Sequence, residues 1–153
     1  MSDNVSWILK NNPDSKIVLW AHNGHVWREK GYMGNFLHAD YSNNYYNIGC
    51  FSNTSTYTAF KDGKLRDDNV LRPNQEGSFE YSFNKTNIPL FYFDFSQLNS
   101  DPNCKWLNKS LEHRVVGALA DVDYISKCKL SSLYNAVIYI DKTDASKCFS
   151  IQK

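Results

Sequence analysis

Four apolar runs divide the chain and predict its strands. The first is IVLWA at residues 17–21, which is continuous rather than alternating and is therefore typical of a strand buried on both faces, as in a parallel sheet. Similar runs follow at residues 88–95 (IPLFYFDF) and 133–141 (LYNAVIYID). A shorter run, YYNIGCF, lies at residues 45–51, and residues 56–60 are expected to extend it or pair with it.

Helical spacing appears between these runs. Val5, Ile8 and Leu9 share one face of a helix predicted at residues 2–10, with Ser2 or Asp3 as its cap. Further helices are expected at residues 31–40, at 78–84 after Gly77-Ser78, and over part of 107–120, whereas residues 61–77 are expected to form a polar surface excursion.

Helices that alternate with buried strands indicate an α/β fold. We expect a layered α/β/α arrangement with a mainly parallel sheet. No linker interrupts the chain, so residues 1–153 are expected to form a single domain.

Composition narrows the classes of partner. The 153 residues are 42% hydrophobic and carry 17 basic and 16 acidic side chains, a formal net charge of +1. This balance gives no reason to expect nucleic acid or an anionic membrane as a partner. No run approaches the roughly 20 apolar residues of a membrane-spanning helix, and the first residues do not resemble a signal peptide. The cysteines are widely spaced, which favours reduced thiols and a cytoplasmic protein: Cys50, Cys104, Cys128 and Cys148.

Two histidines follow the first apolar run directly, in the sequence His22, Asn23, Gly24, His25. Ligands of parallel α/β sheets bind beyond the carboxyl ends of the strands, where this tetrapeptide is expected to lie. Imidazole can move a proton near neutral pH or donate a hydrogen bond to an oxyanion. The amide of Asn23 can orient a histidine or a substrate, and Gly24 permits a tight turn.

Two other interpretations of the histidines remain open. They can simply cap exposed carbonyl groups in a loop. They can also share a metal ion, although the HExxH spacing of metalloproteases is absent and no neighbouring Cys or carboxylate supplies a third ligand. We therefore expect no metal and no other cofactor.

Glu80 is a further candidate for catalysis. It falls in the first turn of the helix predicted at residues 78–84, where a carboxylate also serves commonly as a helix-dipole or capping residue. Arg28 can lie at the edge of a cleft or be an ordinary surface charge. His38 and His113 stand alone, and a satisfied structural or surface role is the expectation for both.

Six segments together resemble the C-terminal half of the erythromycin esterase family, in order and spacing over essentially the whole chain. The most specific is WAHNGHV, followed by MG and then by a tyrosine-rich strand that ends in IG. The segments are NVSWIL, KIVLWAHNGHV, MGNFL, YYNIG, GSFEYSF and YNAVIYIDKT.

The resemblance implies an α/β protein with a cleft between two halves. Family members that inactivate antibiotics hydrolyse the macrolactone ester of erythromycin-type macrolides, which implies a role in macrolide resistance and in the response to antibiotics. A histidine activates water without an obligatory metal. The resemblance implies catalytic roles for His22, His25 and Glu80, and substrate contacts for Asn23, Arg28 and Met33.

The family's principal base histidine and its partner glutamates belong to an N-terminal half that has no counterpart in this sequence. We therefore expect a truncated half or fragment that associates with the missing half or with itself. Three functions remain open: part of an ester or macrolactone hydrolase that is inactive without its other half, a non-catalytic remnant or binding module, and a metal-dependent hydrolase that uses the HNGH histidines.

Overall fold

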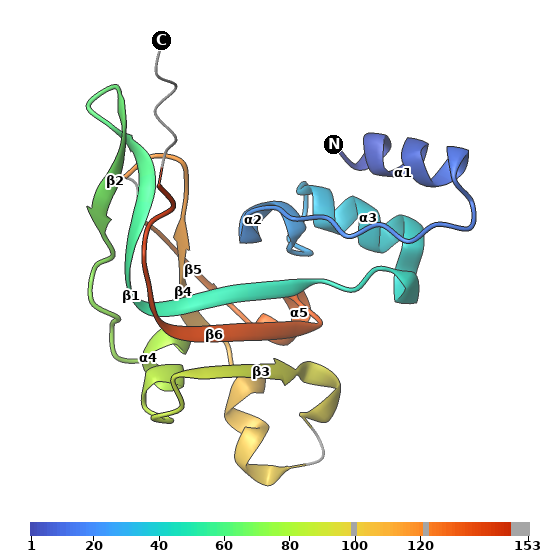
Figure 1. Ribbon diagram of the computed structural model, residues 1–153. Coiled ribbons are helices and arrows are strands. Elements are labelled where there is room, and N and C mark those ends of the chain that lie inside the picture. Colours follow the sequence, from blue (N-terminus) through green and yellow to red (C-terminus); the bar gives the residue numbers. More distant parts are fainter. Residues whose placement is uncertain (99–100, 121–122, 148–153) are drawn as a thin grey trace.

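The computed structural model describes residues 1–98, 101–120 and 123–147, and Figure 1 shows how the elements are arranged. The α-helices are α1 (Ser2–Asn11), α2 (Asn23–Val26), α3 (Met33–Tyr41), α4 (Phe79–Asn84) and α5 (Leu130–Leu133). The strands are β1 (Ile48–Lys61), β2 (Lys64–Val70), β3 (Leu90–Asp94), β4 (Leu111–Val116), β5 (Asp123–Cys128) and β6 (Ala136–Thr143). The 3-10 helices are η1 (Ser42–Asn44), η2 (Phe95–Gln97) and η3 (Pro102–Asn108).

Four strands form one sheet in the order β2–β1–β6–β3, and β4 pairs with β5 in a separate two-stranded sheet. Strands β1 and β6 run parallel, from Ile48 beside Ala136 to Ser55 beside Thr143. The other three pairings among the described strands are antiparallel. The α/β class is therefore confirmed, whereas the expectation of a mainly parallel sheet is wrong.

A tight hairpin accounts for one antiparallel pairing. Asp62 and Gly63 connect β1 to β2, and both have positive φ angles, of 51° and 72°. Two successive residues in this conformation match the right-handed twist of paired strands, which is why Asp-Gly is common at such turns. Residues 61–77, expected to be a surface excursion, therefore contain a strand.

One face of the sheet is covered and forms the core. Phe51, Val137 and Tyr139 point to this face and are almost fully buried. They pack in one hydrophobic cluster with side chains from α4, α5 and η3, including Phe83, whose ring centroid lies 5.6 Å from that of Tyr139. The main core thus lies on one side of the sheet.

The opposite face is exposed over three neighbouring strands. Cys50 lies beside Ile138 and Ile138 beside Tyr92, so side chains of β1, β6 and β3 share this face. Leu90 is 63% exposed and Tyr92 54% exposed. The open sheet face consists of Ile48, Cys50, Ile138, Ile140, Leu90 and Tyr92. The described residues therefore supply no second helical layer, and the expected α/β/α layering is incomplete in this chain.

The first apolar run does not form the expected buried strand. Residues 16–21 make no backbone hydrogen bond to any described residue. Val18 is 95% exposed and Trp20 94% exposed, whereas Ala21 packs against the core. The physical reason is that none of the described strands lies beside this segment to pair with its backbone.

The helices follow the sequence pattern with two exceptions. Helices α1, α3 and α4 lie where they were predicted, and the Ser78 hydroxyl caps α4 by accepting from the Tyr81 N–H at 3.1 Å. The N-cap of α1 is Met1, without a side-chain cap, so the caps expected from Ser2 or Asp3 are wrong. Residues 107–120 contain the end of η3 and then β4, because pairing with β5 overrides any helical tendency there.

Candidate functional site

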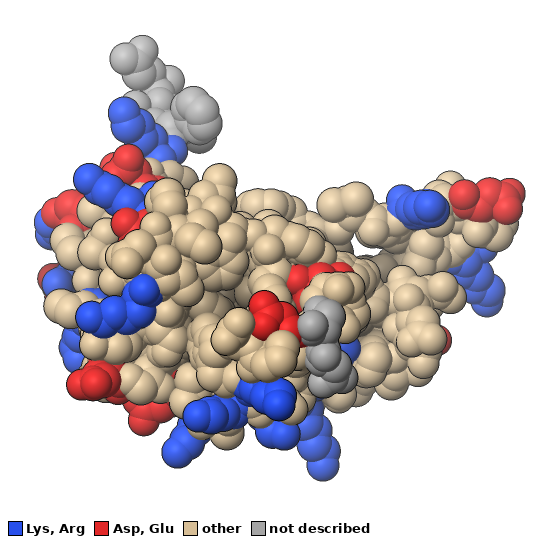
Figure 2. Space-filling view, turned by 90° about the horizontal axis from the view of Figure 1, so that it is seen from below, with Lys and Arg blue, Asp and Glu red and all other residues tan. Residues whose placement is uncertain are grey.

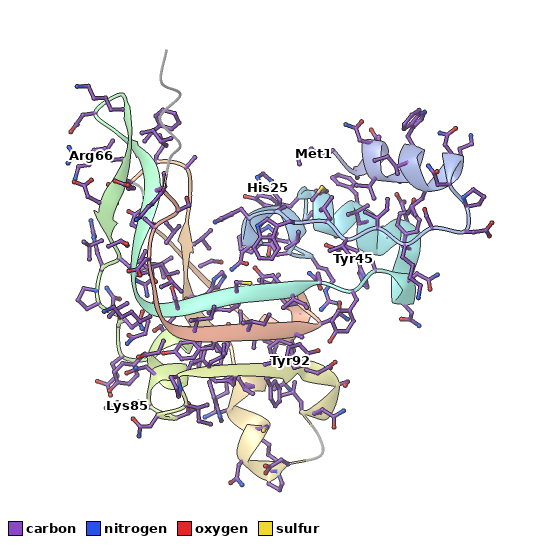
Figure 3. The ribbon with its side chains drawn as sticks, in the orientation of Figure 1. Met1, His25, Tyr45, Arg66, Lys85 and Tyr92 are labelled. Atoms are coloured by element: carbon purple, nitrogen blue, oxygen red, sulfur yellow. The ribbon has the colours of Figure 1, made fainter. Side chains whose placement is uncertain are left out.

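The histidine tetrapeptide forms the short helix α2, which lies beyond the β1 edge of the sheet. His22 is its N-cap and His25 lies in its last turn. Both side chains are exposed, and their ring centroids lie 6.3 Å apart with the ring planes at 80°. Figure 3 shows the position of His25 on this helix. The structure therefore brings the two predicted catalytic histidines together at the surface.

The cap determines which nitrogen of His22 faces outward as a donor. The Gly24 N–H donates to His22 Nδ1 at 3.1 Å, so this nitrogen carries no proton. A neutral ring must then hold its proton on Nε2. His25 has no hydrogen-bond partner among the described residues, so both of its nitrogens remain available. His22 thus presents a hydrogen-bond donor at Nε2, whereas either nitrogen of His25 can carry the proton.

Asn23 fixes the start of this loop to the sheet. Its side-chain Nδ2 donates to the Cys50 carbonyl at 2.6 Å, and its Oδ1 accepts from the Cys50 N–H at 2.9 Å. The amide thereby makes the two bonds that a neighbouring strand would make with Cys50. Its amide group thus holds the histidine loop in place, and the substrate contact predicted for Asn23 stays a prediction.

Buried hydrogen bonds fix the end of the loop. The Val26 carbonyl accepts from Tyr45 Oη at 2.6 Å and from Asn47 Nδ2 at 2.7 Å. Burial raises the pKa of Tyr45 to about 12, so its hydroxyl remains a donor at neutral pH. Asn47 Nδ2 also donates to the Leu133 carbonyl at 2.8 Å, and its Oδ1 accepts from the Asn135 N–H at 3.0 Å. The loop is therefore connected to both β1 and β6.

Asn47, which is buried, and Asn135, which is half-buried, were missed as functional residues by sequence reasoning. Asn47 is only 3% exposed. Its signal was its position: an amide inside a tyrosine-rich apolar run can be buried only if it is hydrogen-bonded. The same argument applies to Asn135, whose Oδ1 accepts from the Asn47 N–H at 3.0 Å.

Two glycines allow close packing around the loop. A Cβ at Gly34 would lie 2.1 Å from the Val26 carbonyl oxygen and 2.4 Å from that of Trp27. A Cβ at Gly49 would lie 2.8 Å from the Phe51 ring. The MG and IG dipeptides of the sequence therefore have a steric reason: no side chain fits where α3 meets the loop, and a side chain at Gly49 would press on the rings of Phe51 and Tyr134.

The other two predicted substrate contacts are not at the surface beside the histidines. Arg28 is half-buried, and its Nη2 donates to the Ser131 carbonyl at 3.2 Å. Burial lowers the pKa of its guanidinium from the usual value. Met33 is 7% exposed and belongs to the core. Their present contacts hold the loop and α3 in place, and their roles toward a substrate stay predictions.

Glu80 is buried at the start of α4, away from the histidine pair. Its Oε1 accepts from the Arg114 N–H at 2.8 Å, whereas its Oε2 has no partner among the described residues. Burial raises the pKa of this carboxyl group. It lines a cavity of about 140 Å³ together with Ser78 and Arg114, and neither His22 nor His25 lines it. The catalytic role of Glu80 stays a prediction.

His113 is also buried, but it lies within the core. Its ring lies edge-on to those of Trp27 and Phe51, with centroids 5.9 and 6.2 Å away. Neither ring nitrogen has a hydrogen-bond partner among the described residues, so the satisfied role expected for this histidine is wrong. Burial lowers its pKa to about 4.

We expect this histidine to destabilise the fold in acid. Between pH 6.5 and about 4 the unfolded chain binds a proton on His113 that the folded chain excludes. The free energy of unfolding therefore decreases as the pH is lowered through this range. The loss should approach about 3 kcal/mol from this residue alone. Urea unfolding at pH 7 and pH 4.5 measures it, and His113→Leu should flatten the slope.

Glu80 opposes this effect, because a carboxyl group with a raised pKa is less costly to bury once it is protonated. The matched variant Glu80→Gln should therefore make the loss in acid steeper. If His113→Leu kept the slope of the original chain, the assignment to this ring would be wrong.

The described residues show no group of three His, Cys, Asp or Glu side chains placed to hold a metal ion. Cys50, Cys104 and Cys128 are free thiols, and Cys148 lies outside the described residues. No helix of the described chain is both long and apolar enough to cross a bilayer.

Comparison with known proteins identifies the family. The family model for erythromycin esterase matches residues 1–143. The chain belongs to the erythromycin esterase family. A comparison with curated protein sequences finds no match.

Solved structures show how this fold occurs elsewhere in the erythromycin esterase family and related proteins. A crystal structure described as a succinoglycan biosynthesis protein superposes with a TM-score of 0.79 at 22% identity. A Bacillus cereus protein superposes with a TM-score of 0.77 at 20% identity, and each comparison covers 94% of this chain. A mutant of the erythromycin esterase EreC in its open conformation gives a TM-score of 0.61 at 18% identity over 99% of this chain.

In all three comparisons the chain spans only 37% of the length of the other protein. The shared fold is thus one part of a longer structure in those proteins.

Proposed function

We propose that this chain forms the histidine-bearing wall of an active site that hydrolyses a carboxylic ester, with macrolactones as the first substrates to test. The observation that carries the proposal is the exposed pair of His22 and His25 on a loop that buried hydrogen bonds hold in place. Family membership supports it, as does the likeness to EreC, which is named as an erythromycin esterase.

The arrangement suggests a division of roles. His22 Nε2 is placed to donate a hydrogen bond to the oxyanion that forms when water attacks the ester carbonyl carbon. His25, with both nitrogens available, is suited to transfer a proton. The new carbon–oxygen bond comes from water, the bond to the alcohol oxygen breaks, and the water's proton passes through the base to the departing alkoxide. The products are an acid and an alcohol.

The histidines form only one side of such a site. Two cavities lie elsewhere among the described residues, and neither is lined by His22 or His25. A reacting ester must be held within hydrogen-bonding reach of its catalytic groups, and loss of that positioning costs several orders of magnitude in rate. We infer that the opposite wall, with the principal base, is supplied by the part of the family chain that this sequence does not match.

We expect His22→Ala and His25→Ala each to lower kcat/KM at least about tenfold in the complete natural protein. Hydrolysis of erythromycin and of p-nitrophenyl acetate measures this effect. His38→Ala, on α3 and outside the loop, is the matched control and should keep most of the activity. Unchanged rates in both loop variants would refute the proposal.

A non-catalytic binding role is the second candidate, favoured by the separation of Glu80 and its cavity from the histidine pair. Titration of erythromycin distinguishes the two. Binding without turnover in the complete protein supports the second candidate, and turnover supports the first.

A further inference from the structure

A cavity of about 420 Å³ lies against the hairpin of β1 and β2, and neither His22 nor His25 lines it. Its volume is within the range of small-molecule binding sites, roughly 300–1,000 Å³. Its charged lining, among the described residues, consists of three cations and one carboxylate: Lys61, Arg66 and Arg72, with Asp68. The lining therefore carries a net charge of about +2, although the whole chain is nearly neutral.

The alternation of side chains along β2 produces this excess. Basic and acidic residues are adjacent in its sequence, KLRDDNV. Arg66 and Asp68 are two residues apart and line the cavity, whereas Asp67 between them does not. Outside the cavity the charges are mixed: Figure 2 shows basic and acidic side chains interspersed at the end of the molecule that carries the hairpin. This distribution favours a small anion over a polyanion, which would need a broad basic surface.

A β-bulge shapes the wall of the cavity. The register between β1 and β2 shifts between Tyr57 and Ala59. Asn69 is only 8% exposed, and its Nδ2 donates to the carbonyls of Tyr57 at 3.2 Å and Arg66 at 2.9 Å. Bulges re-aim the side chains of a strand and are common beside functional sites. Here the buried amide of Asn69 holds the backbone from which Arg66 and Asp68 project.

Tyr57 connects the hairpin to the opposite side of the cavity. Its hydroxyl donates to the Ala120 carbonyl at 2.9 Å, and Ala120 also lines the cavity. Two backbone bonds hold the same segment along β1: the Phe60 N–H donates to the Ala118 carbonyl at 2.8 Å, and the Ala120 N–H donates to the Phe60 carbonyl at 3.0 Å. The two sides are therefore held together by hydrogen bonds.

Asp68 orients the guanidinium group of Arg66. Arg66 Nε donates to Asp68 Oδ1 at 2.8 Å, and Nη2 donates to Oδ2 at 2.5 Å. These bonds use one edge of a planar group that has five N–H donors. The Arg66 side chain is still 49% exposed, and Figure 3 shows it on the hairpin. Its other edge, formed by Nη1 and Nη2, can therefore bind two oxygens of an anion.

We propose that this cavity binds a small phosphate monoester, with its phosphoryl oxygens on Arg66, Arg72 and Lys61 and its organic part against Tyr57. Such a group carries close to two negative charges at neutral pH, which matches the excess in the lining, whereas a carboxylate carries only one. The volume is many times that of a water molecule, about 30 Å³, so there is room for more than a free phosphate ion. The proposal concerns binding only and is independent of the proposed hydrolysis.

The test is titration of the isotope-labelled chain with phenyl phosphate, inorganic phosphate and benzoate, followed by NMR spectroscopy and calorimetry at low salt. We expect phenyl phosphate to bind at least about tenfold more tightly than benzoate or inorganic phosphate. The amide signals that shift should be those of Tyr57 and of residues 66–72, and not those of the histidine loop.

Two substitutions should change the affinity in opposite directions. Arg66→Gln should weaken the binding of phenyl phosphate at least about tenfold, because it removes a bidentate cation. Asp68→Asn should tighten it about threefold, because it removes the carboxylate that opposes the anion. Lys64→Gln is the matched control: Lys64 is a cation of the same strand that does not line the cavity, and the affinity should change less than about twofold. Circular dichroism should show all three variants folded, since each replaces an exposed side chain.

Four results would overturn the proposal. They are the absence of binding by phenyl phosphate, equal affinities for phenyl phosphate and benzoate, equal affinities for phenyl phosphate and inorganic phosphate, and an affinity that Arg66→Gln lowers no more than Lys64→Gln does. A loss of affinity in Asp68→Asn would show that the ion pair is needed to orient Arg66 and would refute the charge argument.

Discussion

Gly34→Ala should remove most of the stability of this fold. The added Cβ would lie 2.1 and 2.4 Å from the carbonyl oxygens of Val26 and Trp27, and both are backbone atoms that cannot rotate away. Helix α3 and the histidine loop must separate to make room. We expect a loss of about 4 kcal/mol or more, at the extreme of single substitutions and a large part of the stability of a small domain. Urea unfolding followed by circular dichroism measures it.

Gly117→Ala is the matched control. Gly117 has no atom within 4 Å of an added Cβ and no positive φ angle, so the same change should alter stability by less than about 1 kcal/mol. If the two variants unfolded at the same urea concentration, the close approach at Gly34 would not be a real constraint.

Asn47→Ala should be the next most damaging change, at about 2–4 kcal/mol. It removes two hydrogen bonds that Nδ2 donates to the carbonyls of Val26 and Leu133, and one that Oδ1 accepts from Asn135. It also leaves a gap in a buried region. Thermal unfolding gives the loss of stability, and proteolysis should show earlier cleavage in the histidine loop.

Asn47→Asp sharpens this prediction, because aspartate has nearly the same shape but cannot donate when ionised. Its oxygens would face the two carbonyls that now accept hydrogen bonds, so we expect it to be at least as damaging as alanine at neutral pH. Asn12→Ala, an exposed asparagine that bonds only within the α1 turn, should have little effect. A fully stable Asn47→Asp variant would contradict the role of the amide as a donor.

Local sequence patterns were sufficient for elements with a clear helical spacing or a continuous apolar run. The helical spacing at residues 78–84 predicted α4, and Ser78 is its cap as expected. Residues 133–141 predicted β6 because a strand in the middle of a sheet is apolar throughout. The Asp62-Gly63 turn was also present as a signal, between Phe60 and Leu65, but residues 61–77 were expected to form a polar surface excursion without a strand.

The remaining errors have a different cause. The pattern at residues 17–21 correctly describes a segment with two apolar faces, but whether both become buried depends on chain that lies beside it in space. The direction of β3 and the pairing of β4 depend on tertiary contacts in the same way. For the site, residue type identified His22 and His25. Asn47 and Asn135, which hold the histidine loop in place, were not found because their role depends on partners near residues 26 and 133.

The bonds that hold the histidine loop also determine when it can form. Helix α2 has only four residues, too few to be stable alone. Some of its anchors lie close by, at Tyr45, Asn47 and Cys50, but others lie far along the chain: Arg28 reaches residues 131 and 133, and Asn47 reaches 133 and 135. A nascent chain that has not yet reached residue 131 therefore lacks the bonds from Arg28 and Asn47 to residues 131–135. The loop should reach its full set of bonds only when β6 pairs with β1, and chains that lack β6 should be more open to proteases at this loop.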